Sequence, residues 1–331
     1  MMISYRAERF SSGRTTVMGL ATALILWFHC DVVVPEGSLL QFFKWMGDIG
    51  VEMFLLASGV GLYFAVEKHP SYGDYLKSRC RRMLPVFLPV TFLWCVYKMA
   101  VWGEGGVGQT LWKLSTMSFW VNGDLSCWYV ASIFLLYLVT PVYIRVWKKH
   151  PAVHSGVILA VYLFDILVVQ RMGVLAHLAI FLYRIPTFLF GLSLGKAIAE
   201  KRVIQINIPI VVILAGGCML LVASCFGMTG FSIPWAYKYF VYGPLAVILS
   251  IACSLLPTGP VTNFLGKRSL EIYLLFEKVQ EFLCYQPAMW ALEGKTKVLF
   301  CLVALAVTLV CAEVLARGTT WLMRGSGRKK T

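Results

Sequence analysis

Long apolar runs separated by short polar segments extend over almost the whole chain. A helix needs about 20 consecutive apolar residues to cross the hydrocarbon core of a bilayer. The segments that approach this length are residues 15–34, 47–66, 83–102, 126–147, 153–170, 174–198, 208–227, 236–256, 269–287 and 297–322. The pattern predicts an all-α fold, a polytopic membrane helix bundle with about ten transmembrane helices.

Charged residues follow the same alternation. Lysine and arginine collect in every second connection and at both ends: Arg6, Arg9, Arg14, Lys68, Lys77, Arg79, Arg81, Arg82, Lys148, Lys149, Lys196, Lys201, Arg202, Lys267, Arg268, Arg317, Arg324, Arg328, Lys329 and Lys330. Because such residues accumulate on the cytoplasmic side of membranes, both termini are predicted to be cytoplasmic. We expect one integral-membrane domain over residues 1–331, with short basic cytoplasmic tails at 1–14 and 323–331.

Composition supports a membrane protein and argues against other classes. Apolar residues make up 59% of the chain and charged residues only 14%, with a mean hydropathy of +0.74. The net charge of +14 therefore reflects topology, and no soluble segment is large enough for a nucleic-acid-binding face. The cysteines lie mostly inside apolar runs without paired CxxC spacing, so neither a metal site nor a disulfide framework is expected.

His29 lies near the outer end of the first apolar run. An imidazole at this depth is costly without a role or a partner, and it exchanges protons near neutral pH. It is therefore a candidate general base. Glu52 lies at a matching depth in the second run, where its carboxylate is predicted to orient the His29 ring. The alternative is that both side chains extend to the interface or cap a neighbouring helix end.

Arg184 lies in the middle of the sixth run, two residues before Pro186. An arginine cannot deprotonate, so at this depth it needs a carboxylate, a cavity or an anionic ligand. The sequence leaves two explanations open. One is an ion pair with Glu277 or Asp165, and the other is binding of a charged ligand.

A cluster of cations, YLKSRCRRMLP, occupies residues 75–85. Arg79 and Arg82 are three residues apart, on one helical face, where two guanidinium groups can hold a phosphate. A plain anchor in anionic membrane lipids is the alternative. The glycine-rich segment 103–108 lacks the context of a phosphate loop and is predicted to be a flexible connection, with phosphate binding a remote alternative.

Sequence blocks that occur in a fixed order resemble the integral-membrane acyltransferase 3 family, over nearly the full length. The blocks are MGLATALILWFH (18–29), GVEMFLLASGVGLYF (50–64), YLKSRCRRMLPVFLP (75–89), LSCWYVASIFLLYLVTPVY (125–143), RIPTFLFGLSLG (184–195) and LGKRSLEIYLLFEKV (265–279). The chain departs from the family at Met18, where a basic residue is usual and Arg14 is one turn earlier. It also departs at Phe276, where a histidine is common and Glu277 follows.

The resemblance implies an acyltransferase with acetyl-CoA or another acyl-CoA as donor and a cell-envelope or exported carbohydrate or glycolipid as acceptor. The resemblance makes His29 the catalytic histidine and Arg79 and Arg82 the donor-binding pair. From their positions in the apolar runs, Glu52 is expected to assist His29, and Arg184 is expected to bind the donor as well. We assign the acceptor to Trp128, Tyr129 and Glu277. No metal is required, and the expected location is the bacterial cytoplasmic membrane.

Two hypotheses from other classes remain. One is a transporter of envelope glycan precursors that uses His29, Glu52 and Arg184 as a proton and substrate pathway; transporters of that kind often contain two related halves, which are not recognisable here. The other is a helper subunit whose basic inner face docks an enzyme, a role that leaves His29 unexplained.

Overall fold

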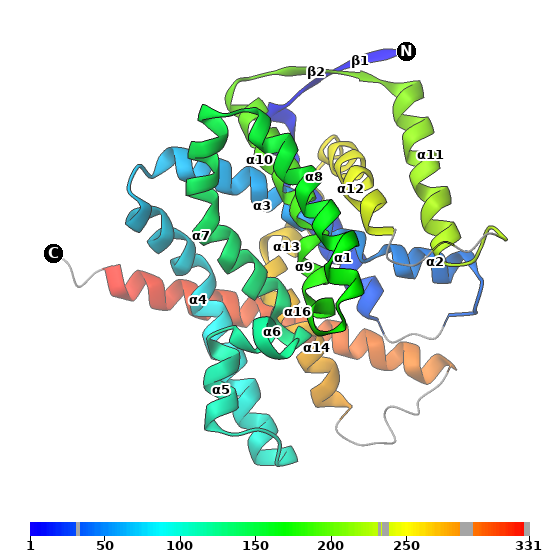
Figure 1. The fold of residues 1–331 in the computed structure, drawn as a ribbon. Coiled ribbons are helices and arrows are strands. Elements are labelled where there is room, and N and C mark those ends of the chain that lie inside the picture. Colours follow the sequence, from blue (N-terminus) through cyan, green and yellow to red (C-terminus); the bar gives the residue numbers. More distant parts are fainter. Residues whose placement is uncertain (31–33, 231–232, 234–237, 285–293, 328–331) are drawn as a thin grey trace.

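A computed structural model describes residues 1–30, 34–230, 233, 238–284 and 294–327 (Figure 1). Its α-helices are α1 (Glu8–His29), α2 (Leu39–Met46), α3 (Ile49–Lys68), α4 (Tyr72–Tyr97), α5 (Val107–Leu114), α6 (Met117–Asn122), α7 (Trp128–Lys149), α8 (Ala152–Leu167), α9 (Ala179–Leu182), α10 (Ile185–Ala199), α11 (Ile208–Cys225), α12 (Lys238–Ser254), α13 (Pro260–Lys267), α14 (Ser269–Leu283) and α16 (Gly294–Gly327). A π-helical turn, Lys98–Trp102, extends α4, and short 3₁₀ turns cover Leu125–Cys127, Val169–Arg171 and Gly173–Leu178. The predicted helical bundle is thus confirmed.

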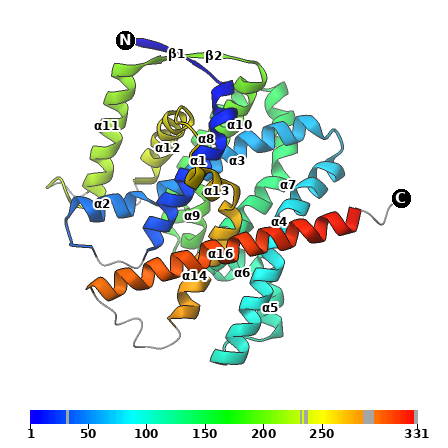
Figure 2. The same cartoon turned by 180° about the vertical axis from the view of Figure 1, so that it is seen from behind.

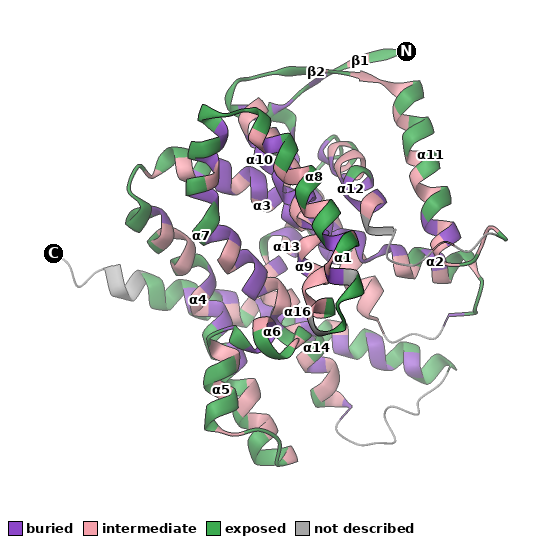
Figure 3. Ribbon diagram, viewed as in Figure 1, coloured by how far each residue is buried: buried purple, intermediate pink, exposed green. Residues whose placement is uncertain are grey.

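Helix α3 lies at the centre of the bundle and is buried on nearly every side (Figure 3). A helix that is apolar all round belongs in a core, and α3 contributes side chains to both large apolar clusters. Its closest neighbour is α10. A β-carbon on Gly59 would run into the Phe188 carbonyl oxygen, and one on Gly191 into the Leu56 carbonyl oxygen. The small residues therefore allow the two backbones to touch, and this contact fixes which face of α3 is turned toward α10.

Helices α1, α12, α7 and α4 also pack against α3, and α16 crosses α14 and α4 on the outside (Figure 2). By length and composition, six helical segments of the described chain are suited to crossing a membrane: Leu39–Lys68, Tyr72–Trp102, Leu125–Lys149, Leu175–Ala199, Ile208–Cys225 and Gly294–Met323. Two shorter apolar helices are Ala152–Leu167 and Phe240–Ser254. The chain is a multi-pass integral membrane protein.

Each of the predicted spans overlaps a helix, but several boundaries were wrong. Helix α4 begins at Tyr72 rather than at residue 83, because Ser71 caps its first turn and the basic residues that follow are good helix formers. The predicted span 174–198 is interrupted at Tyr183 and Arg184, since Pro186 at the start of α10 has no backbone N–H to continue the preceding helix. Parts of the predicted spans 15–34, 236–256 and 269–287, namely residues 31–33, 236–237 and 285–287, lie outside the described residues.

The N-terminal segment is not a simple tail. Strand β1 (Met2–Arg6) pairs antiparallel with β2 (Val203–Asn207), the connection between α10 and α11, and α1 begins at Glu8. The Tyr5 hydroxyl also contacts Ser254 Oγ of α12 at 2.8 Å. At the other end, α16 extends to Gly327, and residues 328–331 of the second predicted tail lie outside the described part. Neither the two strands nor the short helices α2, α5, α6 and α13 were predicted from the sequence.

Candidate active site

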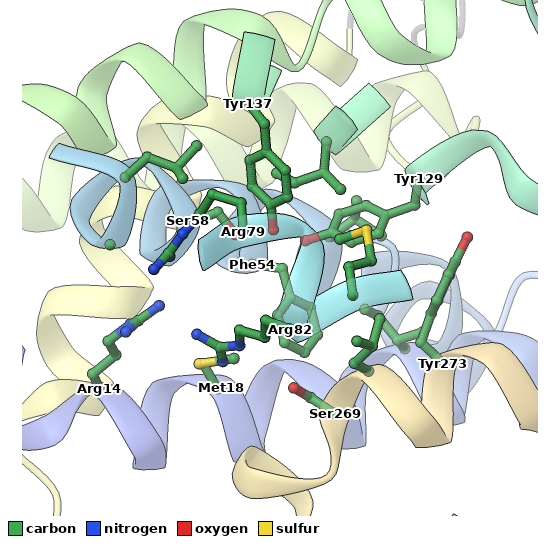
Figure 4. A pocket seen from close by; sticks show the side chains of 17 residues that line it. Arg14, Met18, Phe54, Ser58, Arg79, Arg82, Tyr129, Tyr137, Ser269 and Tyr273 are labelled. Atoms are coloured by element: carbon green, nitrogen blue, oxygen red, sulfur yellow. The ribbon is translucent and has the colours of Figure 1, made fainter. Parts of the chain in front are cut away.

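Three arginines converge on one pocket, which we call the arginine pocket (Figure 4). Its lining residues come from α1, α3, α4, α7 and α14: Arg14, Met18, Ile25, Val51, Phe54, Ser58, Gly61, Leu62, Arg79, Arg82, Met83, Tyr129, Ile133, Tyr137, Ser269, Leu270 and Tyr273. No carboxylate is among them. Like charges gathered in this way repel one another unless an anion lies between them, so the pocket is suited to an anionic group.

The local sequence explains how the guanidinium groups meet. Arg79 and Arg82 are three residues apart on α4 and both face the pocket, as their spacing predicts. Arg14 lies on the same face of α1 as Met18, and a β-carbon at Gly61 would lie only 2.9 Å from its Nη2 atom. Arg14 Nε is buried and has no hydrogen-bond partner in the described part of the chain. Gly61 therefore makes room for a guanidinium group that lacks a full set of acceptors.

His29 lies in a second pocket, the histidine pocket, at the C-terminal end of α1. This pocket is lined by Thr22, Ile25, Leu26, His29, Phe54, Ser269, Ile272, Tyr273, Phe276 and Glu277. His29 Nδ1 is 3.1 Å from Glu277 Oε1, and both side chains are partly exposed. A carboxylate on Nδ1 leaves Nε2 free to face the pocket. The pair has the arrangement of a general base with an orienting acid.

The two pockets adjoin each other. They share four lining residues, Ile25, Phe54, Ser269 and Tyr273. Arg14 and His29 mark their far ends on α1 and are separated by about 22 Å of helix rise. The shared wall is largely apolar, so a polar group at the arginines and a reactive group at His29 can belong to one elongated ligand.

Glu52 and Arg184 form a separate buried cluster. Arg184 Nη2 is 2.7 Å from Asp48 Oδ1, and Arg184 Nε is 3.3 Å from Glu52 Oε1. Arg184 Nη1 also donates to the Ile180 carbonyl oxygen at 2.9 Å and to the Tyr183 hydroxyl. Arg184 and Glu52 are both fully buried and line neither pocket.

These contacts correct two sequence predictions. Glu277, rather than Glu52, lies beside His29, because the face of α3 that carries Glu52 is the face packed against α10. Arg184 pairs with Asp48 and Glu52 rather than with Glu277, and the structure does not bring it to the pocket with Arg79 and Arg82. Asp165, the other predicted partner, is buried on α8.

Comparison with known families identifies the chain. The acyltransferase 3 profile, an acyltransferase domain, matches residues 18–317. The chain belongs to the acyltransferase 3 family. It is a membrane acyltransferase, which supports the transferase prediction over the transporter and helper-subunit hypotheses. No curated protein and no solved structure matches the chain.

The remaining predicted site residues divide between the pockets and the buried cluster of this acyltransferase. Tyr129 lines the arginine pocket, whereas the Trp128 ring lies against Arg184, 4.9 Å from its guanidinium carbon. Phe276, which stands where the family often has histidine, lines the histidine pocket beside Glu277. Sequence reasoning missed Asp48, although an acid at the start of the predicted run 47–66 was a visible signal.

Proposed function

We propose that this acyltransferase moves an acyl group, in the first instance acetyl, from acyl-CoA to a hydroxyl group of a cell-envelope or exported carbohydrate or glycolipid. The adjoining pockets carry the proposal, because a cluster of three arginines and a histidine–carboxylate pair lie at opposite ends of one apolar passage. In CoA, the diphosphate and the thioester are separated by the extended pantetheine arm. The three arginines and His29 are separated in the same way, with the apolar passage between them.

The donor would lie along α1. Its diphosphate would bind Arg14, Arg79 and Arg82, since guanidinium groups bind phosphate through paired, charge-assisted hydrogen bonds. The pantetheine arm would pass between Ile25 and Phe54. The thioester would then reach His29.

His29 Nε2 would accept the proton of the acceptor hydroxyl while that oxygen attacks the thioester carbonyl carbon. Collapse of the tetrahedral intermediate breaks the carbon–sulfur bond, and the departing CoA thiolate takes the proton back from His29. Glu277 would hold the ring in the required tautomer and stabilise the imidazolium formed in between. The reaction yields the acylated acceptor and free CoA.

Transfer by the purified protein in lipid nanodiscs tests the proposal directly. Release of CoA from acetyl-CoA should depend on added envelope glycan or glycolipid, and the acetyl group should be recovered as an ester on that acceptor. A deletion strain should lack the same ester in its envelope, consistent with the expected bacterial cytoplasmic membrane location. Purified, folded protein that transfers no acyl group to any envelope fraction would contradict the proposal.

Replacing both Arg79 and Arg82 with alanine should raise the KM for acyl-CoA at least tenfold and lower kcat much less. Each charge-assisted hydrogen bond to phosphate contributes about 1.5 kcal/mol or more, and binding shared by ground state and transition state affects KM. Arg81→Ala is the matched control, because Arg81 belongs to the same basic cluster and does not line the pocket. If all three arginines only anchor the helix in anionic lipid, the control and the double variant will behave alike.

Glu277→Gln should lower kcat by no more than about fivefold, because a half-exposed ion pair contributes at most about 1 kcal/mol. The amide keeps its oxygen beside Nδ1 and loses the charge that favours imidazolium. Initial rates at saturating donor, measured from pH 5 to 9, provide the test. An unchanged rate and an unchanged pH profile would remove Glu277 from the mechanism.

A further inference from the structure

A further cavity lies at the end of the arginine pocket that is remote from His29. It is lined by Val66, Glu67, His69, Pro70, Tyr72, Tyr75, Pro141, Ile144, Arg145 and Lys148. We call it the third pocket. None of these residues belongs to either of the pockets described above.

The third pocket is one helical turn beyond the arginine pocket on three helices at once. On α3, Leu62 of the arginine pocket is followed by Val66; on α4, Arg79 is preceded by Tyr75; on α7, Tyr137 is followed by Pro141. Residues four apart lie one above the other on a helix, with about 6 Å of rise between them. The two pockets are therefore consecutive along the same helix faces, and the third continues the line that starts at His29.

The polar groups of the third pocket are suited to a phosphorylated nucleoside. Arg145 is exposed at the end of α7 and forms no ion pair with any described residue, whereas its neighbour Lys148 is paired with Glu67 at 2.6 Å. Tyr75 is 1% exposed, and its hydroxyl is buried without a hydrogen-bond partner among the described residues. A buried polar group left unpaired costs free energy, so a ligand that supplies an acceptor or donor would relieve it. Tyr72 adds an aromatic ring to the wall.

We propose that the third pocket binds the adenosine 3′-phosphate end of the acyl-CoA donor, with Arg145 on the 3′-phosphate and the Tyr75 hydroxyl on the nucleoside. This inference rests on the proposed use of acyl-CoA. With the diphosphate at Arg14, Arg79 and Arg82 and the pantetheine arm directed toward His29, the adenosine must leave the arginine pocket on the opposite side. The third pocket is a cavity on that side.

The 3′-phosphate can be tested separately, because acetyl-dephospho-CoA lacks only that group. With the wild-type protein in nanodiscs, KM should be about tenfold higher for acetyl-dephospho-CoA than for acetyl-CoA, as expected for the loss of a charged hydrogen bond. Arg145→Gln should raise KM for acetyl-CoA to the dephospho level and leave KM for acetyl-dephospho-CoA unchanged. Lys149→Gln is the matched control, because Lys149 is exposed on the same helix end and does not line the pocket.

Each outcome distinguishes the possible roles of Arg145. If Arg145 binds lipid headgroups instead, the variant will affect both donors equally and respond to the anionic lipid content of the nanodisc. If the variant keeps the wild-type preference for acetyl-CoA, the assignment of the third pocket is overturned while donor use stands. Absence of transfer from either donor, with no calorimetric binding of adenosine 3′,5′-bisphosphate, would contradict the proposed function together with this inference.

Tyr75→Phe provides a second test that does not depend on charge. Removing a buried hydroxyl without a partner should leave the melting temperature unchanged or raise it. If the hydroxyl binds the nucleoside, KM for acetyl-CoA should nevertheless rise roughly threefold, in the range of a neutral hydrogen bond. A stable variant with an unchanged KM would show that Tyr75 does not contact the donor.

Discussion

Replacing His29 with alanine should lower acyl transfer by about 10²–10⁴-fold, the usual contribution of a general base. Without the imidazole, no described group of the histidine pocket other than Glu277 can accept the proton of the acceptor hydroxyl near neutral pH. The measurement is the initial rate of CoA release at saturating donor and acceptor. Donor affinity should stay near the wild-type value, because the three arginines proposed to bind the phosphates line the other pocket, and Arg14, the one on α1, is about 22 Å of helix rise from His29.

The His29 variant should also fold normally. His29 is the last residue of α1, and its carbonyl oxygen, which accepts a hydrogen bond from Gln280 Nε2 at 3.3 Å, survives the substitution. Its side chain is partly exposed, so no buried charge is left behind. His150→Ala is the control, because His150 is an exposed histidine outside the two pockets. Normal acylation by a well-expressed alanine variant would contradict the mechanism.

The sequence identified groups on single helices better than it identified contacts between helices. Arg79 and Arg82 face one pocket because their three-residue spacing decides their relative direction. His29 was identified from its depth in the first apolar run and from the proton-exchange chemistry of histidine. Its partner Glu277 was not identified. Residues on every side of a bundle can lie at the same depth, and both Glu52 and Glu277 lie at a depth close to that of His29.

The orientation of α3 about its own axis explains why Glu277, and not Glu52, lies beside His29. Glu52, Leu56 and Gly59 are four and three residues apart, so they form one face of α3. The close contact between Gly59 and Gly191 turns that face toward α10, and Arg184 is the residue immediately before that helix. The pairing of α3 with α10 determines the direction of Glu52, and the pattern along a single helix does not contain that pairing.

The other differences also arise from contacts that are distant in sequence. The pairing of β1 with β2 depends on the position of the α10–α11 connection, which local patterns do not contain. Helix α4 extends through the basic cluster, and the sequence signal for this extension is the cap at Ser71 rather than hydropathy. Since transmembrane spans were identified from apolar length, the polar helical turns next to them fell outside the predicted spans.

Arg184→Met should destabilise the protein by about 3–5 kcal/mol, the usual result of removing one member of a buried ion pair. The carboxylates of Asp48 and Glu52, which lie 2.7 Å and 3.3 Å from the guanidinium group, would lose this positive charge in a buried site. Thermal unfolding in detergent, followed by intrinsic fluorescence, is the measurement. Arg202→Met is the control, because Arg202 pairs with Glu200 in an exposed position, where such a pair contributes at most about 1 kcal/mol.

Neutralising the acids in the same protein separates a structural role of Arg184 from a ligand-binding role. Adding Asp48→Asn and Glu52→Gln to Arg184→Met removes the unpaired charges, and coupled residues of this kind recover stability together. Because Arg184 lines neither the arginine pocket nor the histidine pocket, we expect the triple variant to recover most of its acyl transfer as well. A stable triple variant that remains inactive would instead show that Arg184 acts on the donor or on the developing oxyanion of the thioester, through a state in which the buried cluster has opened.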